Sequence, residues 1–374
     1  MIIGVDGRPA NEANRAGIGR LCHNLLRALP PLLGDDRLRV YLDAPPRDDF
    51  PITPEQAEFR VLHRRRIWTQ RVLARELRRD PPDVFYSTTL QLPARRGCPG
   101  VATVLDLAFY DFGAYFPWRR RMRARVEARL AVSRATHLIA ISEATKAGVL
   151  QRFGLPQERI SVAYPGVAEG FRPRDSADGG VQARARFGLP ERYVLYVGRL
   201  QPRKNLVRLV HAFERVLARR PELPHGLVIA GGAGWMEKGL HKAIARSPVK
   251  PRIVQPGYVD EADLPGLMAG ADVLALVSLW EGFGLPLLEA MHCGTPVLAS
   301  NCSSLPEVAG EAGALVDPYD VDAIAASLER LLTDDAWRAQ KAQAGAARAR
   351  QFTWERFAGQ VLAALRRTAA RHPL

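Results

Sequence analysis

The chain has 374 residues, of which 47% are hydrophobic, and a formal net charge of +14. This length is enough for two domains with a core each, and the composition is ordinary for a globular protein. No apolar run approaches the length of a membrane span, and Met1–Val5 is typical of a strand and not of a signal peptide.

The cysteines are few and scattered along the chain. They are Cys22, Cys98, Cys293 and Cys302. Their positions match neither a metal-ligand spacing nor a disulfide framework. This pattern favours a reducing compartment, so we expect a cytoplasmic protein.

The positive charge is concentrated in the first half. Residues 1–168 hold 27 Lys and Arg against 17 Asp and Glu, a net charge of +10, which leaves +4 for the remainder. A basic half of this kind suits nucleic acid, an anionic membrane or a phosphorylated substrate. However, the excess is almost all arginine, spread along helices with much alanine, and a compositional bias gives the same pattern.

The chain opens with a strand followed by a glycine turn. Ile2–Pro9 predicts a first strand with a loop at its carboxyl end, and Asn11–Arg20 continues this loop. Gly17, Gly19 and Arg20 lead into an amphipathic helix. Glycines and an arginine at a helix start suit a phosphate or a sugar, although a plain strand-to-helix turn has the same sequence pattern.

Further apolar runs in the first half predict strands separated by helices. The expected strands are Arg37–Asp43, Glu58–Arg64, Val84–Thr89, Gly100–Phe109, His137–Ser142 and Ile160–Val167. Ile67–Asp80 predicts a helix, because Ile67 or Trp68 shares a face with Val72, Leu73 and Leu77.

A second predicted helix, which starts at Trp118, is rich in arginine. Its apolar residues recur every four positions, and its arginines lie off that stripe. The stripe is Trp118, Met122, Val126 and Leu130, and the arginines are Arg119, Arg120, Arg121, Arg123 and Arg125. The simpler interpretation is a stripe facing the core with a solvated basic face; the alternative is docking on anionic lipid headgroups.

Alternating strands and helices predict an α/β fold with parallel sheets. Phe171–Gly180 is rich in proline, glycine and charge, and we interpret it as a linker. The pattern then restarts with Tyr193–Gly198, which predicts a second doubly wound domain. Ligands of such sheets bind at the carboxyl ends of the strands.

The strongest local signal lies between Trp280 and Ser300. The strand-like run Ala271–Ser278 is followed by Glu281, by glycines on either side of Phe283, and by a helix that carries Glu289. Glycines before a helix let the backbone approach a ligand, and the helix start suits a phosphate. Both carboxylates are therefore placed to accept hydrogen bonds from the hydroxyls of one ligand.

Four segments occur in one order along the second half. They are Val197–Leu206, Leu227–Trp235, Gly257–Ser278 and Glu281–Gly310. Together they resemble the retaining glycosyltransferases of family 4, which have the GT-B fold, and in particular bacterial mannosyltransferases of polysaccharide assembly. Gly17–Arg20 and Ala140–Lys146 extend the resemblance into the first half.

The resemblance implies two Rossmann-like doubly wound domains that face across a cleft. On this basis residues 1–170 are the acceptor-side domain, 171–190 a linker, and 191–351 the domain that binds a nucleotide-sugar donor. The final helix, 352–374, is expected to pack back on the first domain. No metal and no separate cofactor are expected in the reaction.

The resemblance also implies roles for individual residues. Arg199 and Lys204 bind the donor diphosphate, and Glu281 lies beside the donor sugar, so these three are the expected catalytic residues; cations are needed because a charge develops on the leaving group. Other expected donor contacts are Gly19, Gly198, Tyr258, Val259, Phe283, Gly284, Leu285 and Glu289. Gly17, Arg20 and Asp106 are expected on the donor-sugar or acceptor side.

One position departs from the family pattern. Many relatives have a histidine before the aspartate that corresponds to Asp106, and this chain has Leu105 there. A leucine neither donates nor accepts a hydrogen bond. Either Asp106 replaces it in part, or the donor sugar differs, or the activity is weak.

The expected donor is GDP-mannose or a UDP-hexose, and the expected acceptor is a saccharide or a lipid-linked sugar. Nucleic acid is not expected as a partner, whereas peripheral contact with the inner face of an anionic membrane is. The rival hypotheses are another GT-B enzyme, such as a sugar epimerase or phosphorylase, and a degenerate, non-catalytic GT-B protein. The intact Arg199, Lys204, Glu281 and Glu289 argue against the second.

Overall fold

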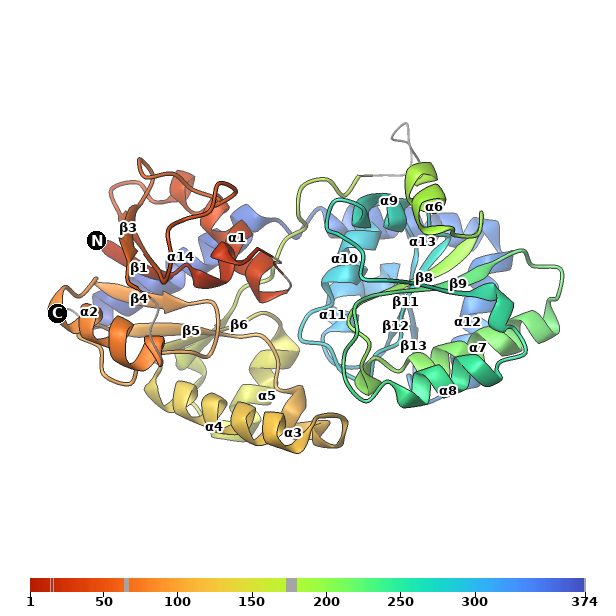
Figure 1. Cartoon of the computed structure of the whole chain (residues 1–374), viewed down its shortest axis with the longest axis horizontal. Helices are drawn as coiled ribbons and strands as arrows, with labels where there is room; N and C mark the ends of the chain where they lie inside the picture. Colours follow the sequence, from red (N-terminus) through yellow and green to blue (C-terminus); the bar gives the residue numbers. More distant parts are fainter. Residues whose placement is uncertain (14, 16, 64–66, 173–179, 373–374) are drawn as a thin grey trace. The chain divides into compact units, whose positions relative to one another are not determined.

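The computed structural model describes residues 1–13, 15, 17–63, 67–172 and 180–372. The chain forms two compact units, neither continuous in sequence (Figure 1). The first unit comprises Met1–Leu107, Arg119–Gly166 and Phe352–Leu374, and the second comprises Ala108–Trp118 and Val167–Gln351. The assignment of residues 108–118 to the second unit differs from the predicted domain boundaries.

The first unit is built on a parallel sheet with the strand order β3-β2-β1-β4-β5-β6-β7 in the described part of the chain. The strands are β1 (Ile2–Asp6), β2 (Arg37–Leu42), β3 (Glu58–Val61), β4 (Val84–Ser87), β5 (Gly100–Val104), β6 (His137–Ala140) and β7 (Ile160–Val162). Most of their residues are buried, as expected for parallel strands.

Helices connect and cover these strands. They are η1 (Arg8–Asn11), α1 (Ile18–Ala28), η2 (Pro30–Leu32), the short π-helix η3 (Thr69–Leu73), α2 (Ala74–Arg79), α4 (Trp118–Arg134), α5 (Glu143–Phe153), η5 (Gln157–Arg159) and α14 (Trp354–Arg371). The N-terminal residue of α4, Trp118, already belongs to the second unit.

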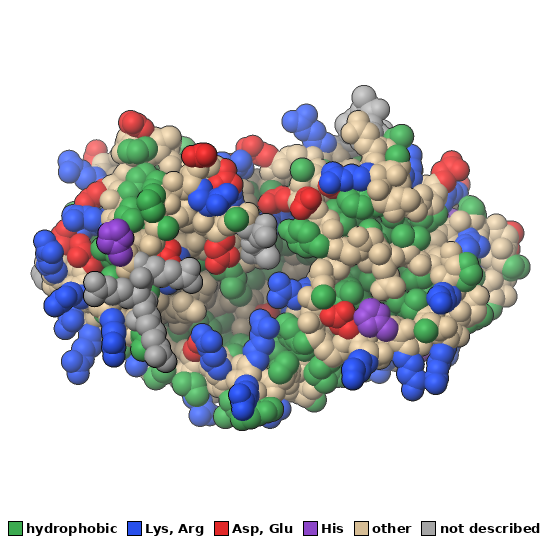
Figure 2. All heavy atoms as spheres, viewed as in Figure 1, with side chains coloured by type: hydrophobic (Ala, Val, Ile, Leu, Met, Phe, Trp, Pro, Cys, Tyr) green, Lys and Arg blue, Asp and Glu red, His purple; other side chains and the backbone are tan. Residues whose placement is uncertain are grey.

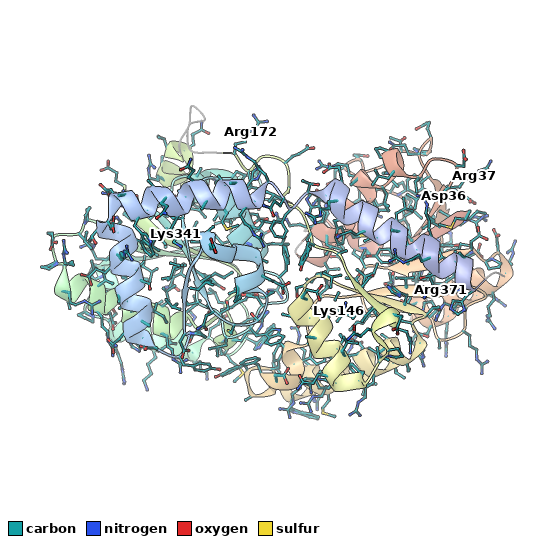
Figure 3. The ribbon with its side chains drawn as sticks, turned by 180° about the vertical axis from the view of Figure 1, so that it is seen from behind. Asp36, Arg37, Lys146, Arg172, Lys341 and Arg371 are labelled. Atoms are coloured by element: carbon teal, nitrogen blue, oxygen red, sulfur yellow. The ribbon has the colours of Figure 1, made fainter. Side chains whose placement is uncertain are left out.

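Helix α14 belongs to the first unit although it is the last element of the chain. It packs against α1, β4 and β6, and its course is seen from behind in Figure 3, where Asp36 and Arg371 are labelled. Arg366 Nε donates to Asp36 Oδ2 at 2.8 Å. The chain approaches Gly166 so closely that a Cβ there would lie 2.4 Å from the Trp354 nitrogen.

The second unit contains a parallel sheet with the strand order β10-β9-β8-β11-β12-β13 in the described residues. The strands are β8 (Tyr193–Val197), β9 (Gly226–Ala230), β10 (Ile253–Gly257), β11 (Val273–Leu276), β12 (Val297–Ser300) and β13 (Ala314–Val316). This is the doubly wound order 3-2-1-4-5-6, in which the order of the strands reverses between the first and the fourth.

The described helices of this unit include short 3₁₀ segments near loops. The elements are α3 (Ala108–Asp111), η4 (Gly113–Tyr115), α6 (Val181–Phe187), η6 (Pro202–Lys204), α7 (Leu206–Arg219), α8 (Lys238–Arg246), η7 (Lys250–Arg252), α9 (Leu264–Ala269), α10 (Leu285–His292), α11 (Leu305–Ala309), η8 (Gly310–Ala312), α12 (Val321–Thr333) and α13 (Asp335–Ala349). No helix in the described ranges is long and apolar enough to cross a membrane.

Three predicted elements differ from the structure. The strand predicted over Gly100–Phe109 ends at Val104, and the chain then turns into α3. In the segment predicted as a linker, residues 181–187 form α6, which packs on α9, while residues 173–179 lie outside the described part. The helix predicted over Ile67–Asp80 starts only at Thr69, with a π-helical turn, and Ile67 before it has a positive φ of 61°.

The apolar stripe of α4 is exposed and does not face the core. Trp118, Met122, Val126 and Leu130 are 65%, 45%, 53% and 42% exposed. The helix instead buries Ala128, Ala131 and Val132 against the unit. The core-facing interpretation of the stripe was therefore wrong: small residues on the other face of the helix make the packing contact.

Candidate active site

The strand order of the second unit brings two loops together. β8 and β11 are neighbours in the sheet, although β9 and β10 lie between them in the sequence. Because the order reverses here, the loops that leave their carboxyl ends flank a crevice at the edge of the sheet. These loops hold Arg199–Asn205 and Val277–Gly284, which include all three expected catalytic residues.

Hydrogen bonds fix the shape of the first loop. Leu200 N donates to Gly232 O at 3.2 Å, and Asn205 adopts the left-handed conformation with a φ of 63°. The buried Asn205 amide donates to Val277 O at 3.0 Å and to Pro318 O at 2.6 Å. Leu279 N donates to Arg203 O at 2.8 Å and so ties the two loops together. The side chains that follow are therefore presented on a fixed backbone.

Glu281 lies at the centre of a charged cluster. Lys204 Nζ donates to Glu281 Oε1 at 2.5 Å, and Arg203 Nη1 donates to Glu281 Oε2 at 3.4 Å. Ser278 Oγ donates to Glu281 Oε1 at 2.6 Å. Arg203 also donates to the Trp280 carbonyl oxygen. The backbone of Glu281 is held as well, since its N donates to Ser303 Oγ at 3.1 Å and its O accepts from Ser304 Oγ at 3.0 Å.

The electrostatics of the cluster follow from its burial. Glu281 is only 7% exposed. Burial alone raises the pKa of Glu281, but the charges of Lys204 and Arg203 and the hydrogen bonds from Lys204 and Ser278 outweigh it and lower the pKa to about 2. The carboxylate is thus charged at neutral pH. Two cations against one carboxylate leave a positive charge that suits a phosphate group.

Arg199 is placed differently from Lys204. It lies at the start of the same loop, and its backbone O accepts from Tyr196 Oη at 3.4 Å. Its side chain is exposed, whereas that of Lys204 is half-buried. The structure thus brings Lys204 and Glu281 into direct contact, and it leaves the Arg199 guanidinium at the surface of the loop.

The glycine turn before α10 forms as the sequence indicates. Gly284 precedes the helix with a φ of 102°, and a Cβ there would lie 2.6 Å from Leu305 Cδ2. Pro286 lies in the first turn, where a missing N–H has no cost. The Phe283 side chain is buried, so a ligand would meet the backbone of Phe283, Gly284 and Leu285. These residues lie at the helix start, where N–H groups lack intrahelical acceptors.

Glu289 lies inside α10 and is only 1% exposed. The predicted hydrogen bonds to ribose hydroxyls therefore require a ligand that reaches the side of this helix. The position is one turn from the helix start and eight residues from Glu281, so both carboxylates belong to the same loop-and-helix unit. Its role remains a prediction.

Glycines and a tyrosine lie close to the loop that follows β8. Gly198 N donates to Ala230 O at 3.0 Å, and a Cβ on Gly231 would lie 1.9 Å from Gly198 O, so close packing explains Gly231. Tyr258 follows β10 and is 61% exposed, with its ring beside Gly232, whereas Val259 is buried. An exposed ring at this edge is suited to stack on a base.

The remaining predicted residues belong to the first unit. Gly17 precedes α1 with a φ of 22°, and a Cβ on the buried Gly19 would lie 2.9 Å from Pro9 O. Arg20 lies in the first turn of α1. Asp106 is half-buried and, with Leu105 before it, follows the end of β5. These residues follow the carboxyl ends of β1 and β5 along the chain, and ligands of parallel sheets bind at that edge.

Several members of the site were not predicted from the sequence. Arg203, which is not among the predicted site residues, contacts Glu281; its place beside Lys204 in a tight turn was the available signal. Ser278 was treated only as the end of a strand. The aromatic segment Phe109–Trp118 was also overlooked: Trp235 Nε1 donates to Tyr115 O at 2.6 Å, and the rings of Phe112 and Trp280 lie 6.0 Å apart.

In the part of the chain that the structure describes, no group of three or more His, Cys, Asp or Glu side chains is arranged to hold a metal ion. The four cysteines are free. The metal-free reaction stays a prediction, tested below.

Two family models match the chain, one over each half. Residues 15–170 match Glycosyltransferase Family 4, and residues 182–351 match Glycosyl transferases group 1. The second match includes both loops of the candidate site. The first includes Gly17, Gly19, Arg20 and Asp106.

Similar proteins support the same assignment. The chain is 33% identical over 307 residues, 81% of its length and 78% of the relative's, to the O-antigen chain mannosyltransferase B of Escherichia coli. It is 36% identical to a D-inositol 3-phosphate glycosyltransferase of Nocardioides sp., over 64% of this chain and 55% of the other. Anabaena HepE, solved with UDP and glucose, has a TM-score of 0.74 at 23% identity and covers 98% of this chain and 99% of its own. The matches over both halves, together with this full-length likeness, show that the chain belongs to the family 4 glycosyltransferases and is a glycosyltransferase of the GT-B fold.

Proposed function

We propose that this enzyme transfers a hexose of the mannose or glucose type from a nucleotide-diphosphate sugar to a saccharide or lipid-linked acceptor, with retention of configuration. The pathway would be the assembly of a surface polysaccharide or glycolipid. The observation that carries the proposal is the cluster of Lys204, Arg203 and Glu281 beside the start of α10. It combines fixed cations for a diphosphate with a carboxylate for sugar hydroxyls.

The cluster suits the departure of a nucleoside diphosphate. The bond between the sugar C1 and the phosphate oxygen breaks, and negative charge develops on the leaving diphosphate. Lys204 is held by Glu281 before any reaction, so little reorganisation is needed to stabilise that charge. The N–H groups at the start of α10 add partial positive charge.

Retention requires no side-chain nucleophile in this proposal. The acceptor hydroxyl attacks C1 from the face that the diphosphate leaves, and a phosphate oxygen of the leaving group takes the hydroxyl proton. One C–O bond forms as the other breaks. The chain's own groups orient the donor: Glu281 accepts from sugar hydroxyls, and Glu289 is proposed to accept from those of the ribose.

The choice of donor rests on the relatives. The name of the Escherichia coli relative favours a mannosyl donor, and hence GDP-mannose, and O-antigen synthesis favours a surface polysaccharide as product. HepE was solved with UDP and glucose, which supports a UDP-hexose as the alternative. An exposed tyrosine ring such as that of Tyr258 suits either base, so it does not distinguish the two donors.

A donor screen tests this function. Each of GDP-mannose, UDP-glucose and UDP-galactose is incubated with the enzyme and a saccharide acceptor, and release of free GDP or UDP is measured. NMR coupling constants of the product then give its anomeric configuration. We expect one donor to be preferred and the product to keep the configuration of the donor. An inverted anomer would contradict retention, and no turnover with any nucleotide sugar would favour the degenerate-protein hypothesis.

We also propose that α4 docks on an anionic membrane, where a lipid-linked acceptor would be found. The exposed stripe of Trp118, Met122, Val126 and Leu130 carries this proposal. Arginines flank it on the same helix, among them the exposed Arg119, Arg120 and Arg123. Figure 2 shows basic and hydrophobic side chains together along the lower edge, where α4 lies in Figure 1. Apolar and basic side chains side by side are typical of interfacial helices.

Vesicle co-sedimentation tests the docking. Wild-type protein should bind anionic vesicles at low salt and lose this binding with neutral lipid or high salt, because headgroup attraction fades within a Debye length. Replacing Arg119, Arg120, Arg121 and Arg123 by glutamine should weaken binding at low salt, and so should Met122→Ser with Val126→Ser, which keeps the charge and removes the apolar contact. If wild-type protein ignores anionic vesicles at low salt, the membrane proposal is wrong.

A further inference from the structure

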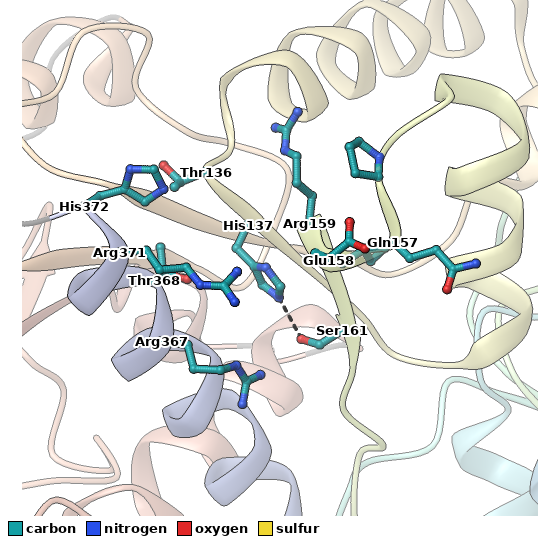
Figure 4. Close-up of a pocket in the computed structure, with 12 residues that line it drawn as sticks. Thr136, His137, Gln157, Glu158, Arg159, Ser161, Arg367, Thr368, Arg371 and His372 are labelled. Atoms are coloured by element: carbon teal, nitrogen blue, oxygen red, sulfur yellow. Dashed lines mark hydrogen bonds between the residues drawn. The ribbon is translucent and has the colours of Figure 1, made fainter.

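A second concave site lies in the first unit, at the amino ends of β6 and β7. It has a volume of about 610 Å³, within the range of small-molecule sites (Figure 4). The last turn of α14 forms one wall, and the segment before β7 forms another. Its polar lining includes His137, Glu158, Arg159, Ser161, Arg367 and Arg371.

The charge of this pocket is positive. Three arginines line it against one carboxylate, that of Glu158. Arg367 and Arg371 are exposed and lie four residues apart, on one face of α14. Neither has a carboxylate partner among the residues that the structure describes. Figure 4 shows both guanidinium groups on the side of the pocket where His137 and Ser161 lie.

Arg159 is held in place, in contrast to these two. Its Nη2 donates to Ala135 O at 2.5 Å and to Val132 O at 3.3 Å, the carbonyl groups at the end of α4. It therefore supplies a fixed positive charge behind the pocket. The guanidinium N–H groups of Arg367 and Arg371 are exposed and can donate hydrogen bonds to a ligand. Two positive charges on one helix face favour an anion bound between them.

His137 and the hydroxyl groups complete the lining. His137 Nε2 lies 2.9 Å from Ser161 Oγ. Burial, with the charges of Arg367 and Arg371, lowers the pKa of His137 to about 4, so the ring is neutral at neutral pH. The positive charge of the pocket thus comes from arginine, while Thr136, Ser161 and His137 offer neutral hydrogen-bonding groups of the kind that bind sugar hydroxyls.

The pocket is separate from the sites described above. It lies where β6 and β7 begin, whereas Asp106 and the glycine turn of Gly17 lie at the carboxyl ends of strands in the same sheet. A parallel sheet places these two sets of ends on opposite edges. None of the residues that we assign to donor or acceptor binding lies at this amino-terminal edge of the sheet.

We propose that this pocket binds a phosphate monoester, such as a phosphorylated sugar. A monoester carries close to two negative charges at neutral pH, which matches the two available guanidinium groups, and arginine forks bind phosphate oxygens in pairs. The neutral lining next to them receives the hydroxylated part of the ligand. Because Arg367 and Arg371 come from α14 and Ser161 from β7, a bound ligand bridges the last helix and the sheet.

Calorimetric titration of the full chain tests this proposal. The probes are inorganic phosphate, glucose 6-phosphate and, as the uncharged comparison, glucose. We expect glucose 6-phosphate to bind, inorganic phosphate to bind more weakly, and glucose to give no signal. Arg367→Gln with Arg371→Gln should weaken binding at least about tenfold, since hydrogen bonds to charged groups contribute well over a factor of ten.

Two controls separate this site from other causes. Lys242→Gln with Arg246→Gln removes the same charge from exposed positions four residues apart in the last turns of α8, and it should leave the titration unchanged. Lys204→Ala removes the central cation of the candidate active site and should also bind glucose 6-phosphate as the wild type does. Binding that is lost in Lys204→Ala but kept in the Arg367/Arg371 variant would overturn the proposal.

A vesicle experiment distinguishes a soluble ligand from a lipid. Phosphatidic acid carries a phosphate monoester, and phosphatidylglycerol carries a diester of lower charge. Preference for phosphatidic acid that disappears in the Arg367/Arg371 variant, with no binding of glucose 6-phosphate, would assign the monoester to a lipid headgroup. If the wild type binds neither glucose 6-phosphate, inorganic phosphate nor phosphatidic acid through these arginines, the pocket is not a monoester site.

Discussion

Each unit pairs a carboxylate with a cation at the carboxyl end of a central strand, and the two pairs connect different parts of the chain. In the first unit Asp6, the last residue of β1, pairs with Arg8, two residues further on, through Nε–Oδ1 at 2.9 Å and Nη2–Oδ2 at 2.6 Å. In the second unit Glu281, after β11, pairs with Lys204, after β8. The first pair stabilises one turn, and the second holds two loops 77 residues apart in sequence.

This difference shows how one architecture supports two roles. The pairing of Asp6 with Arg8 fixes the short backbone segment between them, and the link to a distant segment is made by the cation, since Arg8 Nη2 also donates to Thr69 Oγ1 at 3.0 Å. Glu281, in contrast, pairs with Lys204 across the point where the strand order reverses. This pairing brings a cation from the loop after β8 close to the loop that leads into α10. The second unit therefore carries the site for charge stabilisation, and the predictions below test the connection between its loops.

The largest effect is expected from removing a cation of the second unit. Lys204→Ala or Arg199→Ala should lower kcat with a nucleotide-sugar donor by about two orders of magnitude or more, because each removes a positive charge from the developing diphosphate. Steady-state nucleotide release measures this. Lys242→Ala, an exposed lysine of α8, is the control and should keep normal turnover. Near-normal rates in both site variants would show that the phosphate assignment is wrong.

The next effect concerns the acid stability that Glu281 contributes. Its pKa is lowered from 4.5 to about 2, so the ionised form stabilises the folded state above about pH 4.5, and this contribution is lost as the pH falls toward 2. The full shift corresponds to about 3 kcal/mol. Urea unfolding at pH 5 and pH 3 should show a smaller loss of unfolding free energy for Glu281→Gln than for wild type. Equal losses in both proteins would contradict the buried, ionised cluster.

A smaller effect is expected at Tyr258. Tyr258→Ala should raise the KM for the donor about tenfold with little change in kcat, because stacking on a base contributes ~1–3 kcal/mol and does not change in the reaction. Tyr258→Phe keeps the ring and should restore the wild-type KM. If Tyr258→Ala lowers kcat and leaves KM unchanged, the ring does not act as a base platform.

No effect is expected from a chelator. Turnover in the presence of EDTA should equal that of untreated enzyme, since Lys204, Arg199 and Arg203 are proposed to supply the positive charge that a metal ion supplies elsewhere. Loss of turnover in EDTA that Mg²⁺ or Mn²⁺ restores would contradict the metal-free reaction.

The sequence predicted the fold and the loops of the site because their signals are local. Apolar runs of strand length, the glycines around Phe283 and Pro286 at the helix start all depend on neighbours in sequence. The pairing of Arg203 and Ser278 with Glu281 could not be found in this way, since it depends on where two loops meet in space. The exposed stripe of α4 was misjudged for a related reason: periodicity identifies a helix face, whereas only packing decides that the alanines, and not Trp118 or Met122, face inward.

The interleaving of the two units has a consequence for folding during synthesis. Domains usually fold in the order in which they leave the ribosome. Here the first unit includes α14, so it lacks a packing partner of α1, β4 and β6 until the last residues of the chain have emerged. All strands of the second unit are complete by Val316. The nascent chain therefore completes its second sheet while the first still waits for its final helix, and a ribosome that stops before Phe352 leaves the amino-terminal half, not the carboxyl-terminal half, unfinished.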